Sequence, residues 1–86
     1  MAASTQGLSD KALSIFAFAA YHRLLSGERV SSVIRKDGHG HEADPAGVAE
    51  LETRGLATAS ETEISFGTEA EDFVDTVVDA IRGASA

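Results

Sequence analysis

Cysteine is absent from the 86 residues of the chain, which excludes disulfides and thiolate metal sites. The absence suits a reducing compartment, so we expect a cytoplasmic protein. No apolar run in the sequence is long enough to span a bilayer, and we expect no membrane partner. The segment formed by the first seven residues is short, uncharged and built mostly of small side chains, which predicts a loose tail rather than a targeting segment.

Basic residues are scarce: seven Lys and Arg stand against 14 Asp and Glu, for a net charge of −7. Residues 1–44 hold five acids and five bases, whereas residues 45–86 hold nine acids and two bases, so the net charge lies in the second half. Such a surface repels nucleic-acid phosphate at low salt. The acidic, alanine-rich composition, with more Arg than Lys, resembles that of halophilic archaeal proteins, which work in salt that screens charges over about 3 Å. An ordinary acidic cytosolic protein is the alternative.

The common catalytic patterns are also missing. The sequence has no cysteine nucleophile, no glycine-rich phosphate loop and no His-Glu-x-x-His motif. Its carboxylates fall on predicted helix surfaces, and a chain of this size forms no deep pocket of ordinary volume alone. We therefore expect neither an enzyme nor a cofactor.

A short helix is predicted over residues 45–54. Asp44 is suited to cap it, and Pro45 has the fixed φ that favours the first helical position. Gly55 supplies the left-handed residue that ends the helix, and Leu56 is placed to pack on Leu51 in a Schellman-type stop.

Two strands and a final helix follow. Residues 56–59 and 63–66 alternate between apolar and polar character, which predicts a hairpin. Thr68 and Glu71 have the spacing of a capping box, so a helix should begin there and end at Gly83. Its apolar face comprises Ala70, Phe73, Val74, Val77, Val78 and Ile81.

The first helix should run from the cap Ser9 to Ser26, with Gly27 as its stop. Its middle is apolar nearly all round, so it must be buried on more than one side. The expected core face consists of Leu13, Phe16, Ala17, Ala20 and Leu24. The remaining apolar residues of this helix are Ile15, Phe18 and Ala19. They form a homodimer interface, or the final helix of the same subunit covers them.

The segment between residues 28 and 44 is ambiguous. Val30, Val33 and Ile34 have helical spacing, yet the run is β-branched and short enough for a strand. We favour a brief helix, preceded by a β-residue pair at Arg29 and Val30.

A family resemblance rests on two stretches, Val48-Ala-Glu-Leu-Glu-Thr-Arg-Gly-Leu-Ala-Thr and Ile64-Ser-Phe-Gly-Thr-Glu-Ala. Together they resemble the second half of the winged helix-turn-helix domains of prokaryotic transcription regulators, and the likeness covers about half the chain. It implies an α+β fold with three to four helices and a two- to three-stranded β-wing. We expect one domain over residues 9–83, with tails at 1–8 and 84–86.

The resemblance also implies a DNA-binding, homodimeric regulator with residues 45–54 in the major groove of duplex DNA. The residues it assigns to DNA are Arg35, Lys36 and Arg54 for phosphates, Ala49 and Thr53 for base edges, and Ser60 and Thr62 at the wing tip. The chain departs from the family pattern where DNA-binding relatives usually have Arg or Lys, since those positions hold Glu50, Glu52, Glu61 and Glu63. The alternative is therefore an acidic winged-helix module that binds a protein instead of DNA.

A third hypothesis is a metal-responsive regulator. Asp37, His39, His41 and Glu42 lie in a glycine-rich loop and offer nitrogen and oxygen ligands for zinc, nickel or copper. The commoner interpretation of such a loop is a solvated polar turn. His22 is expected to be a surface or packing residue of the first helix.

Overall fold

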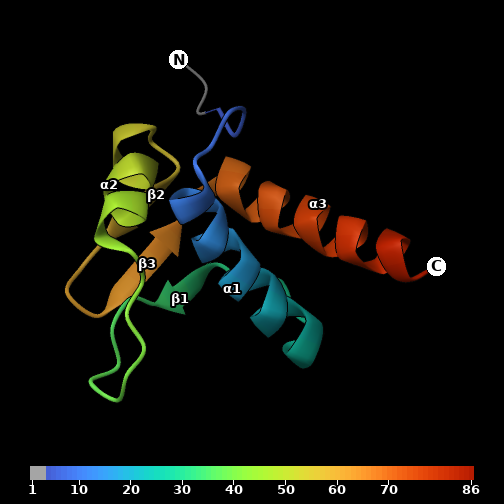
Figure 1. Cartoon of the computed structure of the whole chain (residues 1–86), viewed down its shortest axis with the longest axis horizontal. Coiled ribbons are helices and arrows are strands. Elements are labelled where there is room, and N and C mark those ends of the chain that lie inside the picture. Colours follow the sequence, from blue (N-terminus) through green and yellow to red (C-terminus); the bar gives the residue numbers. More distant parts are fainter. Residues whose placement is uncertain (1–3) are drawn as a thin grey trace.

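The computed structural model describes residues 4–86, so the first three residues of the expected tail lie outside the described part. These residues form three helices and a three-stranded antiparallel sheet, which confirms the α+β class (Figure 1). The elements are, in chain order, α1 (Asp10–Ser26), β1 (Ser32–Ile34), α2 (Pro45–Thr53), β2 (Ala57–Ala59), β3 (Glu63–Phe66) and α3 (Thr68–Ser85). Across residues 4–86, none of the helices has the length and hydropathy needed to cross a membrane.

The predicted ends of α1 are confirmed. The Ser9 hydroxyl accepts a hydrogen bond from the backbone N–H of Ala12 at 3.2 Å, as an N-cap side chain does. At the other end Gly27 has a φ of 74°, and its N–H donates to the carbonyl of Arg23 at 3.0 Å. Local signals in the sequence therefore fix the length of this helix.

The stop of α2 is also as predicted. Gly55 has a φ of 72°, and its N–H donates to the carbonyl of Glu52 at 3.0 Å. The N–H of Leu56 donates to the carbonyl of Leu51 at 2.9 Å, which completes a Schellman motif. Both leucine side chains are fully buried, so the chain turns at Gly55 directly into the core.

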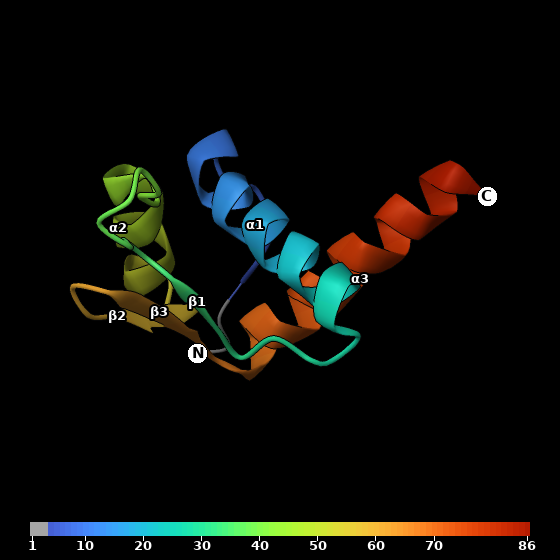
Figure 2. The same cartoon turned by 90° about the horizontal axis from the view of Figure 1, so that it is seen from below.

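The sheet has the strand order β1-β3-β2, and α1 and α2 lie on the same side of it (Figure 2). The predicted helix near residues 30–36 is wrong, because β1 occupies this segment. Val33 pairs with Ile64 and Ile34 pairs with Glu63. The sequence pattern of this segment fits a helix or a strand, and the pairing with β3 makes it a strand. The expected β-pair at Arg29 and Val30 is wrong too, since the strand begins two residues later.

Helix α3 begins at Thr68 as predicted, but the capping box does not form. Its N-cap is Gly67, with no side-chain capping hydrogen bond, and the carboxylate of Glu71 binds Arg29 instead. The helix also continues through Gly83 to Ser85. A glycine inside a helix costs only about 1 kcal/mol, so Gly83 weakens this end without ending it.

The core is centred on Phe16 of α1, which has no exposed surface. Its ring lies 5.6 Å from the ring of Phe66 in β3 and 4.8 Å from that of Phe73 in α3, as measured between centroids. One aromatic side chain therefore joins the sheet to both long helices.

The side of α1 that faces the core differs from the expected one. For Ile15 and Ala19 we expected either a dimer interface or burial within the same subunit; they are 3% and 0% exposed inside the chain's own core, so the dimer interface is wrong for these two residues. Phe18, the third residue of that set, is half-buried and stacks on His41. Conversely, three residues expected in the core are exposed, namely Leu13, Ala17 and Leu24.

The reason is the close approach of α2. A Cβ at Gly47 would lie 2.5 Å from the carbonyl oxygen of Lys11, so the α2 backbone nearly touches the first turn of α1. Because of this contact, the side of α1 that carries Ala12, Ile15 and Ala19 faces the core. Leu13 and Ala17 are left on the outer side.

Candidate functional site

The exposed side of α2 is defined by how the helix is held. Asp44 accepts hydrogen bonds from the backbone N–H groups of Ala46 (2.8 Å) and Gly47 (3.2 Å), which fixes the first turn. Val48 and Leu51 are buried, so the helix presents its opposite side to solvent. The exposed residues there include Ala49, Glu52 and Thr53.

Arg54 does not belong to that exposed side. Its guanidinium donates to the backbone carbonyl oxygens of Gln6 (2.6 Å) and Gly7 (3.0 Å) and lies 3.8 Å from the carboxylate of Glu50. Gln6 and Gly7 lie in the segment before α1, so Arg54 anchors that segment to the end of α2. The predicted phosphate contact is thus occupied by the chain's own backbone.

Glu50 faces the same junction. The Ser9 hydroxyl donates to one of its carboxylate oxygens at 2.6 Å, and the Ser9 backbone N–H donates to the other at 3.0 Å. These hydrogen bonds, with a smaller contribution from Arg54, hold the pKa of Glu50 below its ordinary value. Ser9 therefore caps α1 and binds α2 at the same time. The sequence alone did not indicate the contact between Ser9 and Glu50, because the two residues are 41 positions apart.

The turn between β2 and β3 meets the segment that follows β1. Arg35 donates from Nη1 to the carbonyl of Ser60 at 3.0 Å. Beside this contact lies an open hollow of about 630 Å³, lined by Arg35, Lys36, Asp37, Gly38, Glu42, Glu61 and Thr62. Four of the residues expected to bind DNA are thus brought together here: Arg35, Lys36, Ser60 and Thr62.

Figure 1 shows α2, the β2–β3 turn and the segment after β1 along one side of the molecule. We call this surface the α2 edge and define it by the exposed residues of α2, the turn at 60–62 and residues 35–42. Its carboxylates, Asp37, Glu42, Glu52 and Glu61, outnumber its cations, Arg35 and Lys36. The α2 edge is therefore a mainly acidic surface with one pair of neighbouring basic residues, Arg35 and Lys36.

The histidine loop is organised around its own backbone. The Asp37 carboxylate accepts from the N–H groups of His39 (2.7 Å) and His41 (3.1 Å), which holds the pKa of Asp37 below its ordinary value. The His41 ring stacks on Phe18 with centroids 4.3 Å apart, and its Nε2 lies 3.0 Å from the Ile34 carbonyl. Within residues 4–86 no three His, Asp or Glu side chains converge on a metal-sized site. The metal-sensor hypothesis therefore has no geometric basis in this loop.

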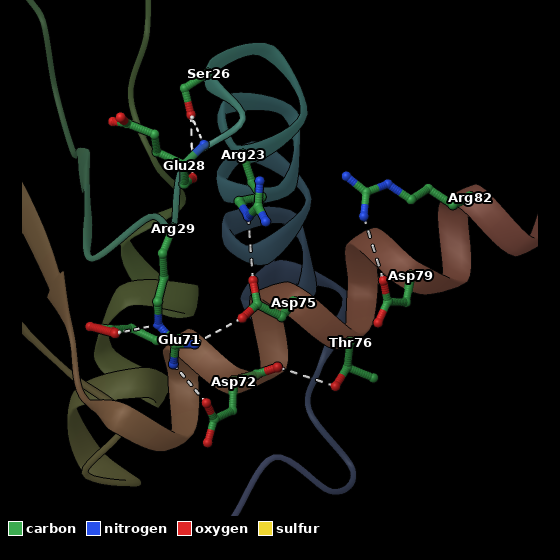
Figure 3. A network of polar contacts seen from close by, with 10 residues as sticks. All are labelled: Arg23, Ser26, Glu28, Arg29, Glu71, Asp72, Asp75, Thr76, Asp79 and Arg82. Atoms are coloured by element: carbon green, nitrogen blue, oxygen red, sulfur yellow. Dashed lines mark hydrogen bonds and ion pairs between the residues drawn. The ribbon is translucent and has the colours of Figure 1, made fainter.

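An ion cluster that the sequence did not reveal ties α3 to the segment between α1 and β1 (Figure 3). Arg29 donates to Glu71 at 2.8 Å, to Asp72 at 2.6 Å and to Asp75 at 2.9 Å. Arg23 of α1 lies 3.5 Å from the other oxygen of Asp75. Hydrogen bonds to Asp72 and Glu71 raise the pKa of Arg29, so the guanidinium stays charged. These contacts are structural, because they join parts of the same chain.

Comparison with known protein families, characterised proteins and solved structures gives no match to this chain. The roles of its residues therefore rest on the geometry described above.

Proposed function

We propose that this domain is an acidic protein-interaction module on a winged-helix-like scaffold, and that its α2 edge binds a basic polypeptide. The order of strand, helix and hairpin supports the scaffold, with α2 in the place of the recognition helix and β2–β3 as the wing. The region before α2 has one helix fewer than the full helix-turn-helix motif, because β1 and a loop occupy residues 32–44. A cytoplasmic location suits a chain that lacks cysteine.

The position of Arg54 is the observation that carries this proposal. A DNA-binding helix needs cations that face outward, because phosphate contacts supply most of the affinity. Arg54 instead donates to Gln6 and Gly7, while Glu52 and Glu61 stand on the exposed surface. An acidic edge of this kind attracts Lys and Arg side chains and repels a duplex.

Charge reversal tests the proposal with a matched control. The probe is a labelled lysine- and arginine-rich peptide, titrated by fluorescence anisotropy in 0.1 M KCl. Glu52→Lys combined with Glu61→Lys should weaken binding at least about tenfold, because both changes fall on the α2 edge. Glu28→Lys combined with Glu69→Lys changes the net charge equally, but both residues are exposed and lie outside the α2 edge, so this pair should alter the affinity much less. Equal effects of the two pairs would mean that only net charge matters, and the proposed site would be wrong.

A homodimeric DNA-binding regulator is the second candidate, and one observation favours it. The hollow brings Lys36 beside Thr62, and Arg35 binds the Ser60 carbonyl, so a phosphate near the wing tip would meet two cations. In multimolar salt, screening would also remove much of the repulsion from the nearby carboxylates. For this candidate, Lys36→Glu should weaken duplex binding at all sequences alike, and Glu52→Lys should strengthen it at low salt.

A further inference from the structure

One side of α1 is apolar, uncharged and uncovered. Helical spacing places Leu13, Ser14, Ala17, Phe18, Tyr21, Leu24 and Leu25 side by side over four turns. The exposed fractions are 38% for Leu13, 56% for Tyr21, 42% for Leu24 and 69% for Leu25. The exposed parts of these four side chains add up to apolar surface on the order of 400 Å², within the range of the largest patch on a typical monomer. Ile81 of α3, 46% exposed, lies on a separate surface.

The end of α3 is the second uncovered surface. Figures 1 and 2 both show its last turns extending away from the end of α1 and from the sheet. Residues 79–85 are all exposed, although helical turns without tertiary contacts are marginal in water. Ile81 is the one large apolar side chain of this segment. The projecting turns therefore offer an apolar side chain that their own subunit does not cover.

The distribution of charge on these two surfaces indicates which partner they bind. Between Leu13 and Leu25 the uncovered side of α1 holds no charged residue, and the exposed carboxylate of Asp10 lies one turn before Leu13. The projecting turns of α3 hold only Asp79 and Arg82, which pair with each other at 3.7 Å. Both surfaces are thus neutral in a chain of net charge −7. A basic partner would be drawn to the acidic surfaces elsewhere, whereas a second copy, equally acidic, meets least repulsion where both surfaces are neutral.

We propose that the projecting turns of α3 pack across the uncharged side of α1 of a second copy, and that two-fold symmetry repeats this contact. Two α1 and two α3 helices then bury Tyr21, Leu24, Leu25 and Ile81 in one interface. The α2 edge stays exposed in this dimer. The proposal is therefore independent of what that edge binds.

Sedimentation of the full chain tests the assembly in 0.1 M and 2 M KCl. The unmodified protein should be a dimer at about 100 μM. Tyr21→Glu combined with Leu25→Glu, and separately Ile81→Glu, should raise the dimer dissociation constant at least about tenfold with unchanged circular dichroism. Thr58→Glu adds a charge on the exposed face of the sheet, and it should leave the dimer intact. A monomer at both salt concentrations, or a dimer that resists both α1 and α3 variants, would overturn the proposal.

The absence of native cysteine allows a direct test of which helices meet. Leu25→Cys and Ile81→Cys proteins are mixed and treated with a short bis-maleimide. The proposed contact predicts cross-links between the two different variants, identified by mass spectrometry. Cross-links only between identical variants would show a dimer of another geometry and contradict the α1–α3 contact.

Discussion

Gly47 of α2 lies against the backbone of Lys11 in α1, so close that a Cβ would stand 2.5 Å from the carbonyl oxygen and 2.8 Å from the carbonyl carbon. Real Cβ atoms do not approach backbone atoms to this distance. The glycine therefore sets the spacing of the two helices, and with it the side of α1 that enters the core.

Gly47→Ala should destabilise the fold by about 1–3 kcal/mol, because α1 and α2 must move apart. Intrinsic helix propensity alone would favour alanine by about 1 kcal/mol. Gly83→Ala in α3 is the control, since a Cβ there meets nothing within 4 Å, and this variant should gain stability. Urea unfolding measures both changes. A stabilised Gly47→Ala variant would contradict the close packing.

Phe16→Ala should cost about 3 kcal/mol, because it empties the centre of the core between Phe66 and Phe73. The measurement is the midpoint and slope of urea unfolding. A loss below about 0.5 kcal/mol would mean that α1 is not central to the fold.

The Ser9–Glu50 contact should make stability depend on pH in the acid range. The pKa of Glu50 is lowered in the folded state, so its carboxylate stabilises the fold above its ordinary pKa of 4.5, and this contribution is lost as the pH falls through the folded pKa. Glu50→Gln should therefore flatten the fall in stability below about pH 5. The comparison is urea unfolding of both proteins at a series of pH values. Parallel profiles would show that the contact does not stabilise the fold.

Removal of Arg29 should have an effect that depends on salt. Arg29→Met leaves Glu71, Asp72 and Asp75 without their shared cation, so the thermal midpoint should fall at low salt. In 2 M KCl the loss should shrink, because the carboxylates then repel one another less. Lys36→Met removes the same charge from an exposed position and should change the midpoint little at either concentration. Equal losses for the two variants would contradict a specific role for the cluster.

The helix ends could be predicted because their signals are local. Ser9, Asp44 and Gly55 each act on backbone groups within a few residues, and all three do so as predicted. The hairpin was predictable for the same reason, since its strands are separated by a short turn. The capping box at Thr68 and Glu71 does not form: the N-cap is Gly67, and the carboxylate of Glu71 binds a distant residue, Arg29.

Features set by tertiary packing were not predictable from one sequence. Val33 and Ile34 fit a helix or a strand, and only the pairing with β3 decides between them. At the candidate site the sequence identified the acidic character of α2 and the wing. It assigned Arg35, Lys36, Ser60 and Thr62 to one DNA-binding set, and the structure brings these four residues together. The sequence could not show that Arg54 turns inward, because the carbonyls of Gln6 and Gly7 are almost fifty residues away in the chain.

Selection of DNA from a random-sequence duplex pool by the unmodified protein, in parallel at 0.1 M and 2 M KCl, tests the central claim most directly. It needs no knowledge of an operator. An acidic α2 edge with Arg54 occupied predicts that no sequence is enriched at either salt concentration, while the basic peptide still binds at 0.1 M KCl. Enrichment of a duplex whose binding is lost in Lys36→Glu would contradict the interaction module and establish the DNA-binding regulator in its place.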